Sequence, residues 1–288
     1  MPEVSQAPSY GGRSRGGVTD AVRDLGRRLL PAEARRWLRH SQGVLLNAVT
    51  LGRGLSRTLP GGEVVRVSPL SRGLSWNLDE YRAFREATQT GATVCDIGAN
   101  AGAYSLLFGR WVGSSGRVFA FEPSPATRVN LQRHLQLNKL CGVVEVVPAA
   151  VADQCTEAEF TTAAPDGMHR LATKSAGMHT VRVPVVTLDS FCAERNVQPN
   201  VIKIDVEGFE LAVLHGARET LKRVGRNLEA FMEIHPSLWP EIGIAQADVA
   251  GELERQGLEV APLIPGMPVW TTEGVCLRLR RVRSCESS

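Results

Sequence analysis

The chain is 288 residues long, enough for one large domain or two small ones that bury a sizeable core. Its 43% hydrophobic and 22% charged residues are ordinary for a globular protein, and no apolar run is long enough to cross a bilayer. The net charge of +3 is too small to require a nucleic acid or an anionic membrane as partner. We therefore expect no nucleic-acid partner and no membrane span; the oligomeric state stays open.

The first ninety residues show two patterns. Residues 1–18 are rich in Gly, Ser, Pro and Arg without apolar periodicity, which predicts a disordered tail. Residues 19–90 are predicted to form a helical and strand extension. From Asp20 to Val49 apolar residues recur at roughly helical spacing, and Pro31 can begin a second helix, so two short basic amphipathic helices are expected. We expect them to pack against the main domain, with a partner or a membrane surface as the alternative.

Cysteine usage favours a cytoplasmic location. None of the six cysteines lies in the C-x-x-C spacing of a zinc or redox site, so a reduced compartment fits best. The opening residues also lack the apolar core of a signal peptide. Cys95 falls inside an apolar run and is expected to pack as a small hydrophobic residue.

Residues 91–288 are predicted to form the main domain. Short apolar segments alternate with helical patterns, which predicts a doubly wound α/β domain with a mostly parallel sheet. The predicted strands are 93–97, 118–121, 143–147, 201–206, 230–234, 258–263 and 275–279, and the predicted helices are 104–111, 125–140, 210–223 and 247–256. Residues 153–180 break the alternation and are expected to form an irregular insertion that serves as a lid or binding loop.

A glycine loop follows the first of these strands, in the sequence Asp96-Ile-Gly98-Ala-Asn100-Ala-Gly102. The glycines allow a tight turn and close approach of a ligand, and the next helix offers free N–H groups to an anionic or carboxylate-bearing ligand. The following strand ends at Glu122, which can accept both hydroxyls of a ribose. The two features predict a nucleoside site, against the alternative of a solvated carboxylate at a strand end. The G-x-G-x-x-G spacing of dinucleotide enzymes is absent.

Charged residues interrupt two later strands. Alternation puts Lys203, Asp205 and Glu207 on one side of their strand, at the end where ligands bind in open α/β sheets. Glu233 and His235 share a side of the next strand in the same way. If the two strands are neighbours, all five face one crevice. A structural Lys-Asp pair and a strand-end histidine are the alternatives, but burying such charges is costly unless they are paired or used.

In this order the motifs resemble those of the FkbM-type methyltransferases. The matching segments are VCDIGANAG (94–102), FEP (121–123), the helix with Asn130 and Asn138, PAAV (148–151), VTLD (186–189), IKIDVEG (202–208) with Glu210, and EIH (233–235). The resemblance covers residues 91–236. It implies a class I, Rossmann-like fold with seven strands, the last antiparallel. It also implies S-adenosylmethionine as methyl donor and a small hydroxyl acceptor, either a saccharide or a secondary metabolite such as a polyketide.

The resemblance also implies roles for the residues of the loop. Asp96, Gly98, Asn100 and Gly102 would hold the methionine part of the donor, and Glu122 the ribose. The segment 149–153 would face the adenine edge. Because Ala149 and Ala150 have no side-chain hydrogen-bonding group, that contact is expected from the backbone or from Asp153.

Methyl transfer to an alcohol requires alignment of oxygen, methyl and sulfur and removal of the hydroxyl proton. Asp205 or His235 is the expected base, Lys203 would stabilise the developing alkoxide, and Glu207 and Glu233 would orient these groups. As an alternative, Asp205, Glu207 and His235 bind a divalent metal that polarises the hydroxyl, although a metal is not expected.

Other functions remain alternatives at this point. RNA methylation or N-methylation is the nearest, because Lys203, Asp205 and Glu233 loosely resemble the charged set used on ribose hydroxyls. An NAD-dependent oxidoreductase and a non-catalytic partner with the same fold belong to different classes.

Overall fold

The computed structural model describes residues 32–71, 74–161 and 180–282. At its centre lies a seven-stranded sheet in the order β11-β12-β10-β9-β3-β4-β5. Its strands are β3 (Thr93–Ile97), β4 (Arg117–Phe121), β5 (Val144–Val147), β9 (Val201–Ile204), β10 (Glu229–Ile234), β11 (Leu258–Pro262) and β12 (Val275–Arg281). Only β12 runs against its neighbours. The α/β expectation is confirmed, including the seven strands and the antiparallel last strand of a class I methyltransferase fold.

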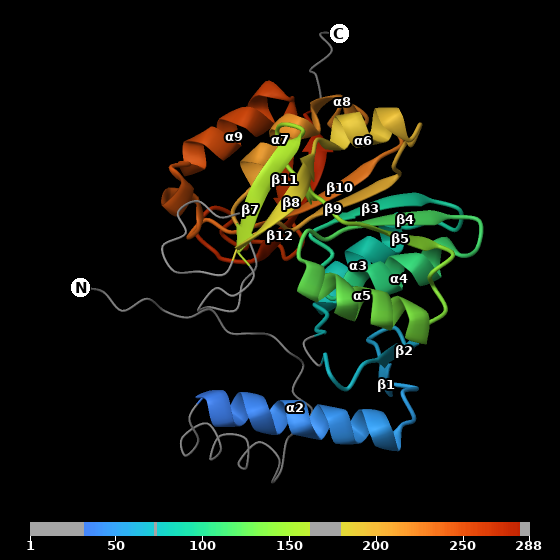
Figure 1. Cartoon of the computed structure of the whole chain (residues 1–288). Coiled ribbons are helices and arrows are strands. Elements are labelled where there is room, and N and C mark those ends of the chain that lie inside the picture. Colours follow the sequence, from blue (N-terminus) through green and yellow to red (C-terminus); the bar gives the residue numbers. More distant parts are fainter. Residues whose placement is uncertain (1–31, 72–73, 162–179, 283–288) are drawn as a thin grey trace.

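Helices cover both faces of this sheet, with α3 (Leu78–Ala87), α4 (Ala103–Val112) and α5 (Pro125–Leu137) on one side (Figure 1). On the other side lie α6 (Leu188–Glu194), α7 (Glu210–Gly216), α8 (Arg218–Leu221) and α9 (Gln246–Arg255). Strands buried on both faces read as continuous apolar runs, which is why the sequence predicted most of them within one or two residues. Cys95 is fully buried within β3, as expected.

Two predicted elements end early. The strand expected to reach residue 206 stops at Ile204, so Asp205 and Glu207 lie in the following loop. The helix predicted over 210–223 is divided at Ala217. Gly216 packs there so closely that a Cβ atom would lie 1.9 Å from the carbonyl oxygen of Ala152. The end of α7 therefore packs directly against the backbone of Ala152.

That second sheet has three strands, β6 (Ala150–Val151), β7 (Thr156–Thr161) and β8 (Thr180–Val186), in the order β6-β8-β7. The expectation of an irregular insertion over 153–180 is therefore wrong for its first part. Alternation in β7 turns Phe160 inward, where it is 5% exposed, and allows polar residues outward. Residues 162–179 lie outside the described ranges.

The N-terminal extension contributes α2 (Ala32–Val49), the hairpin of β1 (Leu55–Thr58) and β2 (Val64–Val67), and α3. The amide of Asn138 joins β2 to the end of α5 through two bonds to the backbone of Arg66, at 2.9 and 2.7 Å. The second predicted helix corresponds to α2, while the tail over 1–18 and the first helix fall outside the described residues. Within the described ranges, none of the helices combines the length and apolar character needed to traverse a membrane.

The packing expected for the second amphipathic helix differs from the structure. Gly43 of α2 lies against Pro69 and Leu70, but Leu45 and Val49 on its apolar face are 65% and 70% exposed. These two side chains are therefore not buried against the described part of the main domain, and the helix lies apart from the sheet (Figure 1).

Candidate active site at the C-terminal edge of the sheet

The loop after β3 has the tight turn expected from its glycines. Gly98, Asn100 and Gly102 all have positive φ, at +81°, +49° and +90°. A Cβ atom at Gly98 would lie 1.8 Å from the carbonyl oxygen of Asp205, and one at Gly102 would lie 2.5 Å from Leu131. The glycines are therefore required both by the backbone conformation and by close packing.

Asp96 is 1% exposed and lies just before this loop. Its Oδ2 accepts a hydrogen bond from Ser105 at 2.5 Å, and its Oδ1 lies 4.0 Å from Nζ of Lys203. Oδ1 accepts no hydrogen bond among the described residues. Asp96 also lines a cavity of about 580 Å³ beside the loop. Burial raises the pKa of Asp96 in spite of the nearby ammonium group.

Glu122, at the end of β4, supports the loop from the neighbouring strand. Its two oxygens accept backbone N–H bonds from Asn100 at 2.9 Å and Ser124 at 2.7 Å. Burial is the main cause that raises the pKa of Glu122 to about 7. Each carboxylate oxygen has a second lone pair, so Glu122 retains acceptor capacity for hydroxyl groups.

Lys203 and Asp205 form a tight pair where β9 ends. Nζ of Lys203 lies 2.9 Å from Oδ2 of Asp205 and 5.3 Å from the centre of the Tyr104 ring. Lys203 is 3% exposed, yet Asp205 is a quarter exposed and lines the cavity. Burial opposes the charged amine, but the carboxylates of Asp205, Asp96 and Glu233 together raise the pKa of Lys203.

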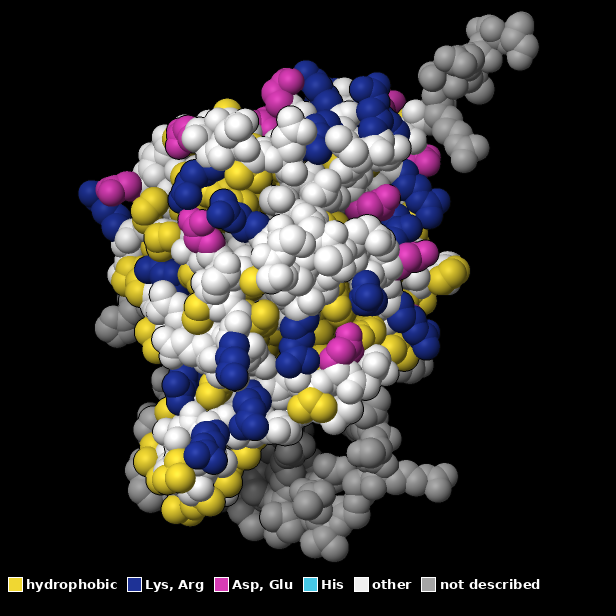
Figure 2. Space-filling view, turned by 90° about the vertical axis from the view of Figure 1, so that its right-hand side faces the viewer, with side chains coloured by type: hydrophobic (Ala, Val, Ile, Leu, Met, Phe, Trp, Pro, Cys, Tyr) yellow, Lys and Arg dark blue, Asp and Glu magenta, His cyan; other side chains and the backbone are white. Residues whose placement is uncertain are grey.

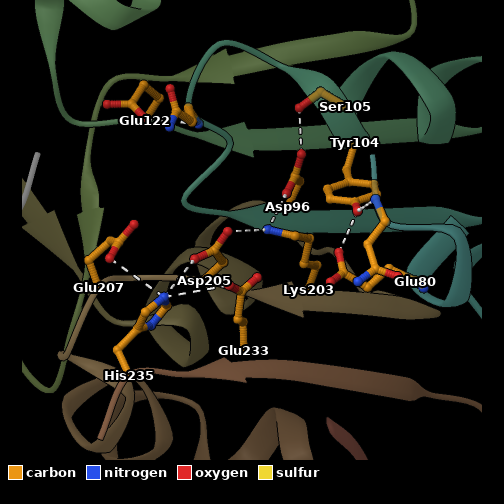
Figure 3. Close-up of polar contacts among 12 residues, drawn as sticks. Glu80, Asp96, Tyr104, Ser105, Glu122, Lys203, Asp205, Glu207, Glu233 and His235 are labelled. Carbon is orange, nitrogen blue, oxygen red and sulfur yellow. Dashed lines mark hydrogen bonds and ion pairs between the residues drawn. The ribbon is translucent and has the colours of Figure 1, made fainter. Parts of the chain in front are cut away.

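Three carboxylates lie around the imidazole of His235, because β9 and β10 are parallel neighbours and their C-terminal ends lie side by side (Figure 3). Its Nε2 lies 3.5 Å from Oε2 of Glu207, 3.5 Å from Oε1 of Glu233 and 3.9 Å from Oδ1 of Asp205. Burial alone would disfavour the imidazolium, but contacts with Glu210, Glu233 and Glu207 raise the pKa of His235 to about 11. All five residues predicted for the crevice thus lie within one cluster.

The role of Glu210 was missed by the sequence interpretation, which noted the residue only as part of a motif. Its side chain is fully buried. Oε1 accepts from the N–H of Gly208 and faces Nδ1 of His235, both at 2.9 Å, while Oε2 accepts from the indole of Trp239 at 2.7 Å. Glu210 therefore fixes the orientation of the imidazole.

A cavity of about 580 Å³ lies between the glycine loop and this cluster. The loop, Asp96, Lys203, Asp205 and Glu233 form one side, and residues of the N-terminal extension form another. Glu80 of α3 is the charged member of that second side: it is 6% exposed and accepts a hydrogen bond from the Tyr104 hydroxyl. Burial is the main cause that raises the pKa of Glu80 to about 7, with Glu233 adding to it. The sequence does not indicate this position, because an acidic residue in an amphipathic helix is ordinarily exposed to solvent.

Asp153 is exposed and residues 149–152 are buried; none of these five residues is among those that line the cavity. For a metal, the structure brings together Asp205, Glu233 and His235, whose ligand atoms lie within 4.8 Å of one another. The metal alternative from the sequence named Glu207 in place of Glu233, and the two carboxylates each lie 3.5 Å from Nε2 of His235.

Residues 96–260 match the family described as the methyltransferase FkbM domain, which is more than half of the chain. The chain belongs to the FkbM methyltransferase family. It is accordingly an S-adenosylmethionine-dependent methyltransferase with the α/β fold described above. The FkbM match begins at Asp96, so the extension that carries Glu80 lies ahead of it.

Two curated relatives of this FkbM protein illustrate the range of similarity. It is 27% identical over 173 residues to the hexuronic acid methyltransferase AglP of Haloferax volcanii, covering 59% of this chain and 67% of that protein. It is 30% identical over 143 residues to methyltransferase 1 of Beauveria bassiana, covering 43% of this chain and 57% of that protein. The crystal structure of methyltransferase FkbM from Methylobacillus flagellatus KT superposes with a TM-score of 0.41 at 16% identity, covering 69% of this chain and 50% of that one.

Proposed function

We propose that this FkbM methyltransferase transfers the methyl group of S-adenosylmethionine to a hydroxyl oxygen of a small polyhydroxylated acceptor such as a sugar. The observation that carries the proposal is that the glycine loop and the Lys203–Asp205 pair line one and the same cavity. A donor and an acceptor that bind in this cavity meet without a bimolecular encounter in solution.

The donor would lie across the glycine loop. Asp96, Gly98, Asn100 and Gly102 are proposed to hold its methionine part, since Asp96, Gly98 and Asn100 line the cavity and one oxygen of Asp96 has no hydrogen bond among the described residues. Glu122 is proposed to accept the ribose hydroxyls through its free lone pairs. The adenine edge would meet the backbone of residues 149–152 or the side chain of Asp153; like Glu122, none of these is among the residues that line the cavity.

In the reaction, the acceptor oxygen attacks the methyl carbon as the bond from carbon to sulfur breaks. The electron pair stays on sulfur, which gives neutral S-adenosylhomocysteine, and the hydroxyl proton leaves the acceptor. We assign Asp205 as the proton acceptor rather than His235, because a pKa of about 11 keeps the imidazole protonated at neutral pH. Lys203 holds the carboxylate in place and stabilises the negative charge that develops on the acceptor oxygen.

The acceptor class follows from cavity size and from similarity. A space of about 580 Å³ must take both donor and acceptor, which suits a small molecule better than a folded RNA. On the face shown in Figure 2, Lys and Arg are spread from top to bottom, with Asp and Glu among them over the upper part. The name of the Haloferax relative, a hexuronic acid methyltransferase, adds support for a sugar-derived acceptor.

Labelled methyl transfer tests the proposal. We expect the full chain to transfer the methyl group of labelled S-adenosylmethionine to a member of a panel of neutral sugars, uronic acids and polyketide alcohols. Amines and RNA fragments serve as the competing classes, and label on either of them would contradict O-methylation. Adenosylhomocysteine is expected to raise the melting temperature, whereas NADH is not; the reverse would indicate an oxidoreductase.

A further inference from the structure

We propose that Asp205, Glu233 and His235 bind a divalent cation at the mouth of the donor cavity. The binding itself is independent of the proposed reaction; only the use of the ion to hold two adjacent hydroxyls of the acceptor rests on that function. Neither the family match nor any relative described above assigns such a site.

The three ligand atoms lie within 4.8 Å of one another. Nε2 of His235 lies 3.5 Å from the nearest oxygen of Glu233 and 3.9 Å from that of Asp205. Two atoms that are each about 2.1 Å from one ion are roughly 3–3.5 Å apart when they occupy neighbouring positions. Side-chain rotations that bring the two carboxylates closer together would therefore complete the coordination.

The histidine is prepared for this role by its other nitrogen. Its Nδ1 faces Oε1 of Glu210 at 2.9 Å, and Glu210 is itself fully buried and fixed by Trp239. Metal-bound histidines usually donate their second N–H to a carboxylate in this way. His235 is only 6% exposed, and Nε2 points at oxygens that lie beyond the range of about 2.7–3.2 Å of a normal hydrogen bond.

Three carboxylates surround Nε2 of His235. Asp205, Glu207 and Glu233 all face this nitrogen, and Lys203 is bonded to the far oxygen of Asp205. Oε2 of Glu207 is buried without a hydrogen bond in the described part of the chain. Without an ion the protonated imidazole balances part of this negative charge, so a divalent cation would take the place of the proton on Nε2 as it binds. Glu207 would then serve as a fourth ligand or as the partner of a bound water.

The donor set indicates the class of ion. Two carboxylates and one imidazole suit Mn²⁺ or Zn²⁺, whereas Ca²⁺ usually takes about six to eight oxygen ligands. Asp205 and Glu233 line the cavity, so the open positions of the ion would face the acceptor. Two adjacent hydroxyls could occupy these positions and lie in front of the methyl group.

Titration of the purified, metal-free full chain with Mn²⁺ tests the site without donor or acceptor. Free Mn²⁺ is counted by its electron paramagnetic resonance signal, and we expect one ion per chain to be bound. Asp205→Asn and Glu233→Gln should each weaken binding by at least about tenfold, and Glu210→Gln by about 10- to 100-fold through loss of imidazole orientation. Glu259→Gln, which removes an exposed carboxylate on β11, is the matched control and should bind as the unchanged chain does.

The melting temperature of each variant separates lost ligation from lost folding. The proposal is overturned if the unchanged chain binds no Mn²⁺, or if folded Asp205→Asn and Glu233→Gln bind it as tightly as the control. Because no methyl transfer is measured, a wrong assignment of the acceptor class leaves this result unaffected.

Discussion

Gly98 touches Asp205 so closely that the donor loop and the proposed proton acceptor form one packed unit. A Cβ atom at Gly98 would lie 1.8 Å from the carbonyl oxygen of Asp205 and 2.9 Å from its carbonyl carbon. The loop after β3 and the loop after β9 therefore cannot shift independently. A change at one of them should be felt at the other.

We expect Gly98→Ala to destabilise the protein and to abolish donor binding. The φ of +81° costs an alanine about 1–2 kcal/mol, and the clash with backbone adds about 1–3 kcal/mol because no side chain can rotate away. Urea denaturation and calorimetric titration with adenosylhomocysteine measure the two effects.

Gly243→Ala is the matched control for strain without a clash. Gly243 also has positive φ, at +74°, but nothing lies within 4 Å of its missing Cβ atom. It should lose only the conformational share of the stability and keep the donor affinity. Equal effects at the two positions would show that close packing against Asp205 is unimportant.

A second prediction concerns donor recognition by Glu122. Glu122→Gln replaces one acceptor oxygen by a donor group, which disturbs both the ribose contact and a backbone bond to the loop. Hydrogen bonds to charged groups contribute about 1.5–3 kcal/mol, so affinity for adenosylhomocysteine should fall roughly ten- to more than a hundredfold. An unchanged dissociation constant would remove Glu122 from the donor site; Glu145→Gln on the neighbouring strand serves as control.

Stability should depend on pH through Glu80. Its pKa is about 7 in the folded protein and 4.5 in the reference state, so the folded state binds more protons between these values. Stability from this group is therefore fully present below pH 4.5 and is lost as pH rises through 7, by at most about 3 kcal/mol. Glu80→Gln should remove that dependence.

Urea denaturation at several pH values measures this difference between the unchanged chain and Glu80→Gln. Glu86→Gln changes an exposed carboxylate on the same helix and should leave the pH dependence as it was. Parallel pH profiles for the unchanged chain and Glu80→Gln would show that Glu80 titrates near its ordinary pKa.

The catalytic assignment predicts the behaviour of Asp205→Asn. This substitution keeps shape and volume but removes the charge that accepts a proton or holds a cation. Turnover should fall by about two to four powers of ten, while the affinity for adenosylhomocysteine changes little. Near-normal turnover with a true acceptor would leave only positioning as the source of catalysis.

Much of the main domain was predictable because buried parallel strands produce apolar runs that end in functional residues. Placing Asp205 and His235 in one crevice required only the assumption that their strands are neighbours, because each residue directly follows its strand. The assumption was right, since β9 and β10 pair directly. The residue roles themselves remain predictions.

Other parts of the site depend on contacts distant in sequence. Glu80 reaches the cavity only because α3 packs beside α4, where Tyr104 donates to it. Glu210 resembles an ordinary acidic residue in a first helical turn until Trp239 and His235 are placed around it. The strand β7 was missed because its partner β8 is separated from it by eighteen residues, so no local turn signal joins them.

Until residues 275–281 have left the ribosome, the central sheet lacks the strand that joins β11 to β10. During synthesis both of those strands would present unpaired edges, and Leu277 and Leu279 would not yet contribute to the buried core on one face of the sheet. Chains released before residue 275 should therefore aggregate rather than fold, even though they contain the whole donor loop and the acidic cluster. Assembly of this half of the sheet therefore waits for the synthesis of β12.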